Sequence, residues 1–271
     1  MTSSAPATAF VDRGGAMNPR IRHWKGARVW VIGASTGIGA ATATLLLSKG
    51  ARVALSARNT SALQTLADNN LQALVLPLDI TQHADVQKAH EHLLSAWGGI
   101  DIVLIVAGVY NEMRADSIDM VVVNQVLDIN LRGTFNCIDV VLPSLLKQSY
   151  GGIGIVSSVA GFSGLPKALV YGPSKAALIN LCESLYFDLS RRGNAVYLIN
   201  PGFVKTPATA NNDFVMPGLI SADEAAREIL SGMERGQFHI HFPKRFTNWL
   251  RLARLLPYRW YFYLIHKVTG L

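Results

Sequence analysis

The sequence predicts an α/β fold in which a single domain is built around a doubly wound parallel sheet. Short apolar segments alternate with segments of helical length from residue 28 onward, and no linker interrupts this order before residue 200. Strands that alternate with helices pair in parallel through right-handed crossovers. Half of the 271 residues are hydrophobic and only 16% are charged. This composition excludes a disordered chain and supports one large core.

The expected elements follow one another in a regular order. Strands are expected at 28–32, 53–56, 73–78, 102–106, 153–157 and 195–199, and helices at 38–49, 61–69 and 84–97. Ser221-Ala-Asp-Glu224 has the pattern of a capping box, which opens one more helix. We divide the chain into a flexible leader at 1–24, a main domain at 25–243 and a C-terminal amphipathic helical extension at 244–271.

The positive charge of the chain is concentrated in that extension. The net charge is +7, and residues 235–271 hold seven Lys or Arg without any Asp or Glu. The rest of the chain is balanced, so the extension needs its own explanation. The two cysteines, Cys137 and Cys182, predict neither a disulfide framework nor a metal site. Because residues 1–16 lack the apolar stretch of a secretory signal, we expect a cytoplasmic protein.

A glycine-rich segment, Gly33-Ala-Ser-Thr-Gly37-Ile-Gly39, lies where the first expected strand turns into the first helix. Glycines there let the backbone approach a diphosphate, and the helix N-terminus supplies N–H groups and partial positive charge. The GxxxGxG spacing differs from the GxGxxG of the standard dinucleotide fingerprint. A tight turn without a ligand is the alternative, but the strand before and the helix after favour a Rossmann-like dinucleotide site.

The end of the second strand distinguishes between the two nicotinamide cofactors. An NAD site usually carries an acidic residue here, which binds the ribose 2′-hydroxyl. This chain has Ala57 and Arg58 instead, and an arginine can pair with a 2′-phosphate. We therefore predict NADP(H) in preference to NAD(H), with a merely solvated Arg58 as the alternative. Asp79, after the third strand, either binds the adenine edge or caps the next helix.

Candidate catalytic side chains follow in the second half of the domain. Tyr171-Gly-Pro-Ser-Lys175 opens a helix, and the four-residue spacing puts the phenol and the ammonium on one helical face. A nearby cation lowers the pKa of a tyrosine, as acid–base catalysis requires. Ser158 ends an apolar strand thirteen residues upstream, at the sheet edge where ligands bind.

In this order and at this spacing, the residues resemble the classical short-chain dehydrogenase/reductase family. The resemblance runs from about Lys25 to Thr206. Besides the glycines, Ser158 and the YxxxK pair, it includes Asn130 in Asp-Ile-Asn-Leu-Arg-Gly and the segment Asn200-Pro201-Gly202-Phe-Val-Lys-Thr206. The chain departs from the family at Ile32, where the family has threonine, and at Ile105-Val106-Ala107-Gly108, where it has Asn-Asn-Ala-Gly.

The resemblance implies an NAD(P)-dependent enzyme that interconverts a carbonyl and an alcohol. It assigns proton transfer to Tyr171, binding of the substrate oxygen to Ser158, and a proton-relaying water to Asn130. Lys175 would lower the pKa of Tyr171 and hold the nicotinamide ribose. Thr206 and the backbone near Val204 would position the carboxamide. The full set implied for cofactor binding is Gly33, Ser35, Thr36, Gly37, Ile38, Gly39, Arg58, Asp79, Ile80, Ala107, Gly108, Tyr171, Lys175, Pro201, Gly202, Val204 and Thr206. The resemblance also implies a homodimer or homotetramer formed through the helices around Asn130 and Tyr171.

The C-terminal extension has the pattern of a membrane-surface element. Thr247, Arg251 and Arg254 form one stripe on an otherwise apolar helix at 246–256, and after Pro257 the chain is dense in aromatic residues. Neither apolar stretch reaches the eighteen or so residues that cross a bilayer. A basic amphipathic helix followed by an aromatic band is typical of a membrane interface. Packing on the domain or on a second subunit is the alternative. Residues 208–220 are expected to form a substrate lid.

Three interpretations of the function remain open at this point. The first is an NADP(H)-dependent reductase of a hydrophobic, lipid-like ketone, such as a long-chain 3-keto compound or a sterol-like ketone, peripheral on the inner face of a membrane. The second is a soluble reductase of small carbonyls whose tail serves oligomerisation. The third is a non-catalytic scaffold that senses NADP(H). We find no motif for binding nucleic acid.

Overall fold

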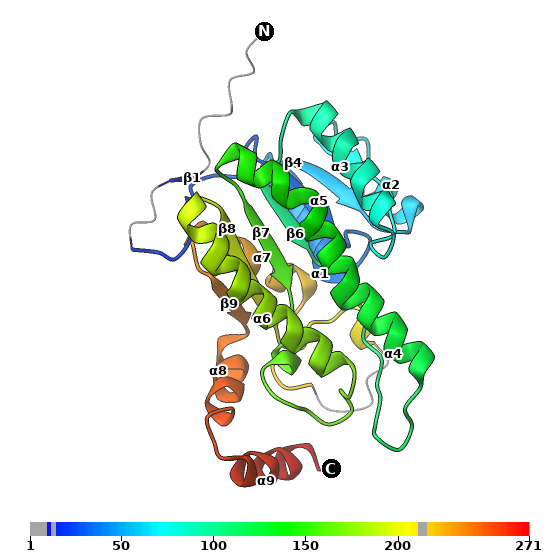
Figure 1. Ribbon diagram of the computed structural model, residues 1–271, viewed down its shortest axis with the longest axis vertical. Helices are drawn as coiled ribbons and strands as arrows, with labels where there is room; N and C mark the ends of the chain where they lie inside the picture. Colours follow the sequence, from blue (N-terminus) through cyan, green and yellow to red (C-terminus); the bar gives the residue numbers. More distant parts are fainter. Residues whose placement is uncertain (1–9, 12–14, 211–215, 271) are drawn as a thin grey trace.

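The computed structural model describes residues 10–11, 15–210 and 216–270. A seven-stranded parallel sheet runs in the order β5-β4-β3-β6-β7-β8-β9. The chain starts the sheet in its middle, at β3, and winds outward first to one side and then to the other (Figure 1). The predicted single α/β domain with a doubly wound parallel sheet is confirmed.

The strands of this sheet are short, and all except the edge strand β5 are mostly buried. They are β3 (Arg28–Ile32), β4 (Arg52–Ser56), β5 (Ala73–Val75), β6 (Ile102–Ile105), β7 (Gly152–Val156), β8 (Ala195–Pro201) and β9 (His239–Phe242). A separate antiparallel pair is formed by β1 (Phe10–Val11) and β2 (Arg20–Ile21). The strand at 73–78 was predicted too long, although the backbone N–H groups of Leu76 and Leu78 still donate to the carbonyls of Leu55 and Ala57. β9 was not predicted, because its two histidines interrupt the apolar pattern.

Helices cover both faces of the sheet. They are α1 (Gly37–Ser48), α2 (Thr60–Ala67), α3 (His83–Trp97), α4 (Met120–Leu127), α5 (Gly133–Gln148), α6 (Tyr171–Leu189), α7 (Ala222–Glu234), α8 (Lys244–Ala253) and α9 (Tyr258–Thr269). Buried side chains of α3, α5 and α6 form the core on one face, and those of α1, α2 and α7 form the core on the other. The capping box at Ser221 and Glu224 is present at the start of α7.

The described part of the expected flexible leader, residues 15–24, is held against the domain. Both polar atoms of the Asn18 side chain bond the backbone of Val196, at 2.7 and 3.1 Å. Trp24 is buried, and its indole N–H donates to the Glu234 carboxylate at 2.7 Å. The leader assignment is therefore corrected for these residues, because a buried amide and a buried indole anchor them. Residues 1–9 and 12–14 lie outside the described residues.

The two helices of the C-terminal extension pack on the domain through their inner faces. Figure 1 shows α8 and α9 at the end of the molecule toward which the carboxyl ends of the strands point. Thr247 is fully buried, and its hydroxyl bonds Nδ1 of His241 at 2.7 Å. The predicted exposed stripe is therefore wrong at Thr247, whereas Arg251 and Arg254 are exposed. The hydroxyl is tolerated in the core because His241 satisfies it.

Candidate active site

A cavity of about 990 Å³ lies at the carboxyl edge of the sheet. Every residue that we predicted to bind the cofactor lines it, as does Ser158. Asn130, in contrast, lies behind the cavity wall, where it is fully buried. Strands β3, β4, β6, β7 and β8 each deliver their following loop to this edge, since parallel strands all end on the same side. The topology therefore brings together residues that are far apart in the sequence.

The glycine loop forms the floor of one half of the cavity. Gly33 has a φ of +99°, and a Cβ placed on it would lie 2.5 Å from the backbone nitrogen of Ala107. Gly37, the first residue of α1, has a φ of +56°. The N-cap Thr36 is extended, and the first turn of α1 contains no acidic residue that would repel a phosphate. The loop therefore fits the diphosphate of a dinucleotide, which needs a close backbone and open N–H groups.

The loop after β6 keeps its geometry although it lacks the family's two asparagines. The backbone N–H groups of Val106 and Ala107 both donate to the carbonyl of Ile32, at 2.8 and 2.9 Å. These main-chain bonds tie the loop to the end of β3, directly beside Gly33. The backbone therefore holds this loop in place although Ile105 and Val106 stand where the family has asparagines.

Arg58 and Asp79 lie at the far end of this half of the cavity. Arg58 is exposed and lines the cavity at the end of β4. Asp79 Oδ1 accepts hydrogen bonds from the backbone N–H and the hydroxyl of Thr81, at 2.9 and 2.8 Å. The helix α3 starts later, with Gln82 as its N-cap. Asp79 therefore shapes a turn rather than capping that helix, while still facing the cavity.

Tyr171 and Ser158 meet in the other half of the cavity. The Ser158 hydroxyl forms a hydrogen bond with the Tyr171 phenol and accepts one from the backbone N–H of Ala160 at 3.1 Å. Burial raises the pKa of Tyr171, the Ser158 hydrogen bond lowers it, and the nearby Tyr110 raises it, so the pKa lies above its usual value. Burial, and not the lowering that we predicted from Lys175, therefore decides the direction of this pKa shift.

Lys175 is buried beside Tyr171 on the same face of α6. Its ammonium lies 5.7 Å from the centre of the Tyr171 ring and donates to the carbonyl of Val156 at 3.0 Å. Burial lowers the pKa of Lys175 to about 8. Gly108 lies directly against this ammonium, because a Cβ placed on it would be 3.1 Å from Nζ. A cation is thus held at the centre of the site, next to the phenol.

Asn130 supports the site from a π-helical turn, Asp128–Arg132, that joins α4 to α5. Its amide exchanges two hydrogen bonds with the backbone of Val109, at 2.8 and 3.0 Å, and donates to the Ser174 hydroxyl at 3.1 Å. Such turns are frequent at functional sites. In this geometry Asn130 braces the loop after β6 against α6. The proton-relaying water implied for it stays a prediction.

The outer wall of the cavity contains residues that the sequence did not indicate. The Tyr110 ring packs edge-on against Tyr171, with ring centres 5.0 Å apart. Tyr110 follows Gly108 at the end of a strand, which is the signal that could have found it. Further wall residues come from the C-terminal helices and are Phe246, Trp249, Leu250, Ile265, Val268 and Thr269. They reach the site through tertiary packing, so no local pattern reveals them.

The expected lid at 208–220 is described only in part. Ala208, Thr209 and Pro217 line the cavity, and Val204 pairs with Ile220 through a short parallel bridge. Residues 211–215 lie outside the described residues. The flanks of the segment thus border the site, while the lid itself stays a prediction.

Comparisons with known proteins agree with this geometry. The sequence model of the short chain dehydrogenase family matches residues 27–214. An uncharacterized oxidoreductase of Myxococcus xanthus is 35% identical over 84% of this chain and 91% of that protein. Another, from Staphylococcus epidermidis, is 36% identical over 68% of this chain and 80% of that protein.

Two solved structures are similar as well. A structure described as ribose-5-phosphate isomerase from Brucella melitensis has a TM-score of 0.74 and is 27% identical, covering 81% of this chain and 92% of its own. The structure of gox2181 has a TM-score of 0.76 and is 23% identical, covering 84% of this chain and 98% of its own. The gox2181 structure shares the fold.

Proposed function

The chain belongs to the short-chain dehydrogenase family, and from this premise we propose that it transfers hydride between NADP(H) and the carbonyl or alcohol group of a hydrophobic, lipid-like substrate. The observation that carries the proposal is the convergence of Ser158, Tyr171 and Lys175 on one cavity whose other half is the glycine loop. A scaffold that only sensed the cofactor would not need a phenol, a hydroxyl and an ammonium gathered beside it.

The preference for NADP(H) is supported by the end of β4. Arg58 lines the cavity where the second strand ends, and Ala57 leaves no acidic side chain there. A carboxylate at this point would repel a 2′-phosphate, whereas a guanidinium pairs with it.

The chain's own residues supply binding and proton transfer, while bound NADP(H) supplies the hydride. Ser158 donates a hydrogen bond to the substrate oxygen and stabilises the charge that develops on it. Tyr171 then donates its proton to that oxygen. The raised pKa of Tyr171 keeps the phenol protonated at neutral pH, which suits reduction. Lys175 would hold the nicotinamide ribose, and its positive charge stabilises the phenolate that remains after the proton transfer.

A hydrophobic substrate is supported by the outer wall of the cavity. Trp249, Leu250, Ile265 and Val268 present apolar surface beyond the Tyr171 hydroxyl. An apolar wall binds a substrate in proportion to the apolar area that it removes from water. A long-chain ketone gains from this wall, whereas a small carbonyl compound leaves most of it uncovered. We therefore propose a ketone with a long apolar chain, at the inner face of a membrane.

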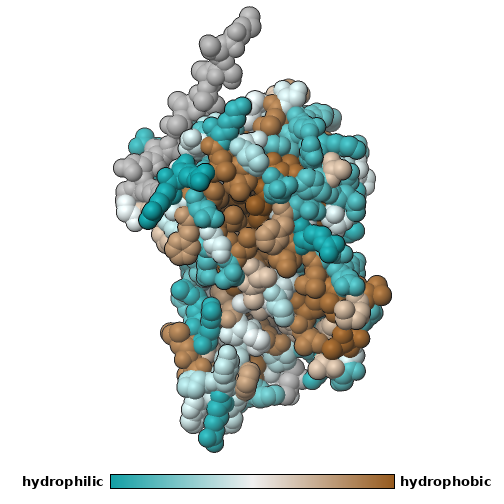
Figure 2. Space-filling view, in the orientation of Figure 1, coloured by the Kyte–Doolittle hydropathy of each residue, from teal (hydrophilic) through white to brown (hydrophobic). Residues whose placement is uncertain are grey.

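We also propose that two or more copies assemble through the helices around Asn130 and Tyr171. Figure 2 shows hydrophobic colour gathered over the face formed by α5 and α6 and again over α4. Exposed apolar residues on these helices are Val121, Leu127, Phe135 and Phe187. Exposed apolar patches of this kind are typical of a contact between subunits.

The test is NADPH consumption against 3-ketones of increasing chain length. The proposal expects the efficiency to climb with chain length and to be higher with NADPH than with NADH. Equal or better turnover of short ketones would support a reductase of small carbonyls instead. No turnover of any ketone, with NADPH still bound, would favour the non-catalytic scaffold.

A further inference from the structure

The C-terminal helices have a buried inner face that fixes them in place. Tyr261 and Ile265 of α9 pack with Ala253 of α8 and with Leu165 and Trp249. The Tyr261 hydroxyl also donates to the carbonyl of Gly164 at 2.8 Å. Because this face is anchored, the opposite face of the two helices is a fixed surface that is presented to the surroundings.

That opposite face combines large apolar side chains with cations, and we call it the tail surface. Its exposed apolar members are Leu252, Leu255, Leu256, Tyr258, Trp260, Phe262 and Tyr263. Leu255 is 79% exposed and Trp260 is 60% exposed, and exposed apolar side chains gathered in one patch mark an interaction site. Its exposed cations are Arg254, Arg259 and Lys267, whereas Arg251 bonds Nε2 of His241 at 3.1 Å on the packed side. The whole stretch from residue 235 to 271 contains no acidic residue.

This combination identifies the chemistry of the partner. Trp and Tyr side chains prefer the headgroup level of a bilayer, and cations next to them are attracted to anionic lipids. Among the residues that the structure describes, no helix combines the length and the apolar character needed to cross a bilayer. We infer that the tail surface docks onto an anionic lipid bilayer from one side.

A second copy of the chain fits this surface less well than a bilayer does. A twofold contact would place the same patch on both sides of the interface, so cations of one copy would approach cations of the other without any acidic partner in this stretch. Like charges brought together across an interface cost several kcal/mol. The apolar face of α4, α5 and α6 offers copies a contact without this repulsion.

The tail surface also adjoins the rim of the cavity, and this step rests on the proposed function. Ile265, Val268 and Thr269 of α9 line the cavity, and Val268 is at the same time 56% exposed. A side chain that both lines a cavity and stays half exposed lies at its rim. A helix of this length spans only about 18 Å, so docking brings the rim next to the lipid. A lipid ketone then enters the cavity without crossing water.

The experiment measures vesicle binding and activity of the full chain in parallel. Vesicles of phosphatidylcholine are compared with vesicles that also contain phosphatidylglycerol. One variant, Arg254→Gln with Arg259→Gln, removes two cations, and its matched control, Arg191→Gln with Arg192→Gln, removes two exposed cations elsewhere. A second variant, Trp260→Ser, is matched by Leu71→Ser, because Leu71 is fully exposed on the main domain.

We expect the wild-type protein to sediment with the anionic vesicles. The double arginine variant should bind them roughly thirty-fold more weakly, the effect of two cations near an anionic surface, and Trp260→Ser should also weaken binding. Both controls should bind like the wild type. With a long-chain 3-ketone dissolved in the vesicles, both tail variants should lose activity in proportion to binding. With a water-soluble ketone they should keep it.

The outcomes separate this inference from the proposed function. Unchanged vesicle binding in both tail variants would overturn the inference, even if activity on the soluble ketone is normal. A tail variant that breaks the oligomer and leaves vesicle binding intact would assign the surface to a second copy and would also overturn it. If no ketone is reduced while the wild type binds vesicles and the tail variants do not, the proposed function fails and the docking surface stands.

Discussion

Buried charges are paired at the amino ends of the strands of the sheet but not at their carboxyl ends. At the amino edge, the guanidinium of Arg28 and the carboxylate of Asp101 form a buried ion pair at 2.6 Å. At the carboxyl edge, the buried ammonium of Lys175 donates to the backbone carbonyl of Val156 instead of a carboxylate. One edge balances its charges, and the other keeps a cation whose charge is available to a ligand.

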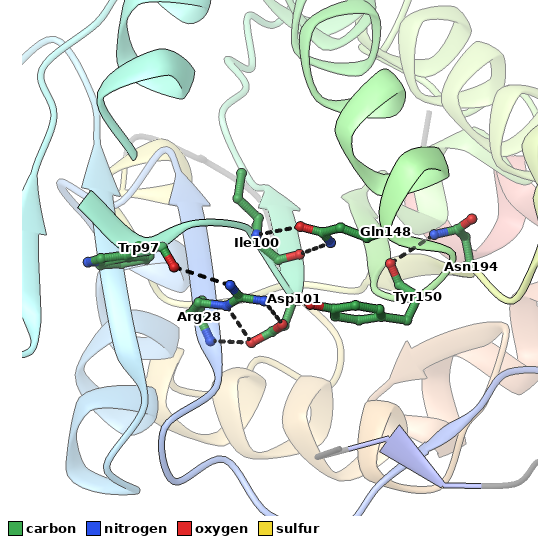
Figure 3. Close-up of polar contacts among 7 residues, drawn as sticks. All are labelled: Arg28, Trp97, Ile100, Asp101, Gln148, Tyr150 and Asn194. Atoms are coloured by element: carbon green, nitrogen blue, oxygen red, sulfur yellow. Dashed lines mark hydrogen bonds and ion pairs between the residues drawn. The ribbon is translucent and has the colours of Figure 1, made fainter. Parts of the chain in front are cut away.

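At the amino edge, hydrogen bonds link this ion pair to neighbouring side chains and backbone groups (Figure 3). The Arg28 guanidinium also donates to the Trp97 carbonyl at 3.2 Å and to the Tyr150 hydroxyl at 2.8 Å. Burial alone would lower the pKa of Arg28, but the hydrogen bonds and the charge of Asp101 outweigh it and raise the pKa. The Gln148 side chain bonds both the N–H and the carbonyl of Ile100. The paired charges of this edge therefore stabilise the fold. At the carboxyl edge, the buried ammonium of Lys175 lowers the stability of the fold but is placed for catalysis.

The largest effect should come from removing the proton donor at the carboxyl edge. Tyr171→Phe deletes one hydroxyl, so we expect kcat to fall by about 10³-fold, within the range for a general acid. NADPH should still bind, because the glycine loop and Lys175 are untouched. Stopped-flow assays and NADPH fluorescence titration measure the two quantities. A variant with wild-type turnover would remove Tyr171 from the mechanism.

Breaking the ion pair at the amino edge should cost stability and leave the chemistry unchanged. Asp101→Asn leaves the Arg28 guanidinium buried without its counter-charge, so we expect a loss of about 3–5 kcal/mol in the free energy of unfolding. Urea denaturation measures it, and KM for the substrate should not change. The double variant Arg28→Met with Asp101→Leu should recover most of the loss, because it leaves no unpaired charge. A single variant as stable as the wild type would contradict the contrast between the edges.

Removing a buried charge at the carboxyl edge should, in contrast, raise the free energy of unfolding. Lys175→Met removes a buried ammonium whose pKa is lowered to about 8, so we expect the folded protein to gain about 3 kcal/mol at pH 7 while activity is lost. Between pH 8 and about 10.4 the unfolded wild type holds a proton that the folded state has released, so Lys175 makes stability rise with pH there. The stability difference between variant and wild type should therefore shrink across this window. Urea denaturation at pH 7, 8.5 and 10 measures this difference. A variant less stable than the wild type at pH 7 would show that Lys175 stabilises the fold.

The sequence predicted the carboxyl edge far better than the amino edge. Gly33, Gly37 and Gly39 share one loop, and Tyr171 and Lys175 share one helical turn, so their spacing carries the signal. Arg28 and Asp101 are 73 residues apart, and only the paired strands bring them together.

Burial and long-range packing explain the remaining failures. Trp249 and Ile265 reach the cavity only because α8 and α9 fold back onto the domain. The direction of the Tyr171 pKa was mispredicted because the sequence shows the neighbouring Lys175 but not the depth of burial, which dominates. Because burial is not visible in the local sequence, Thr247 was also assigned wrongly to the polar stripe. Nothing local indicates that His241 would accept its hydroxyl as a hydrogen-bond partner in the core.

The smallest effect should come from replacing Arg58, at the end of the cavity that we propose binds the 2′-phosphate of NADP(H). Arg58 is exposed, so its pairing with a 2′-phosphate is partly screened by solvent. We expect Arg58→Ala to raise KM for NADPH by about tenfold, equivalent to roughly 1.4 kcal/mol, with KM for NADH unchanged. Arg132 is the matched control, because it borders the adjacent pocket but is already paired with Asp128 at 2.9 Å. Arg132→Ala should therefore leave both constants unchanged. Equal losses for the two cofactors in Arg58→Ala would mean that the guanidinium binds a group common to both, and the preference for NADP(H) would then need another source.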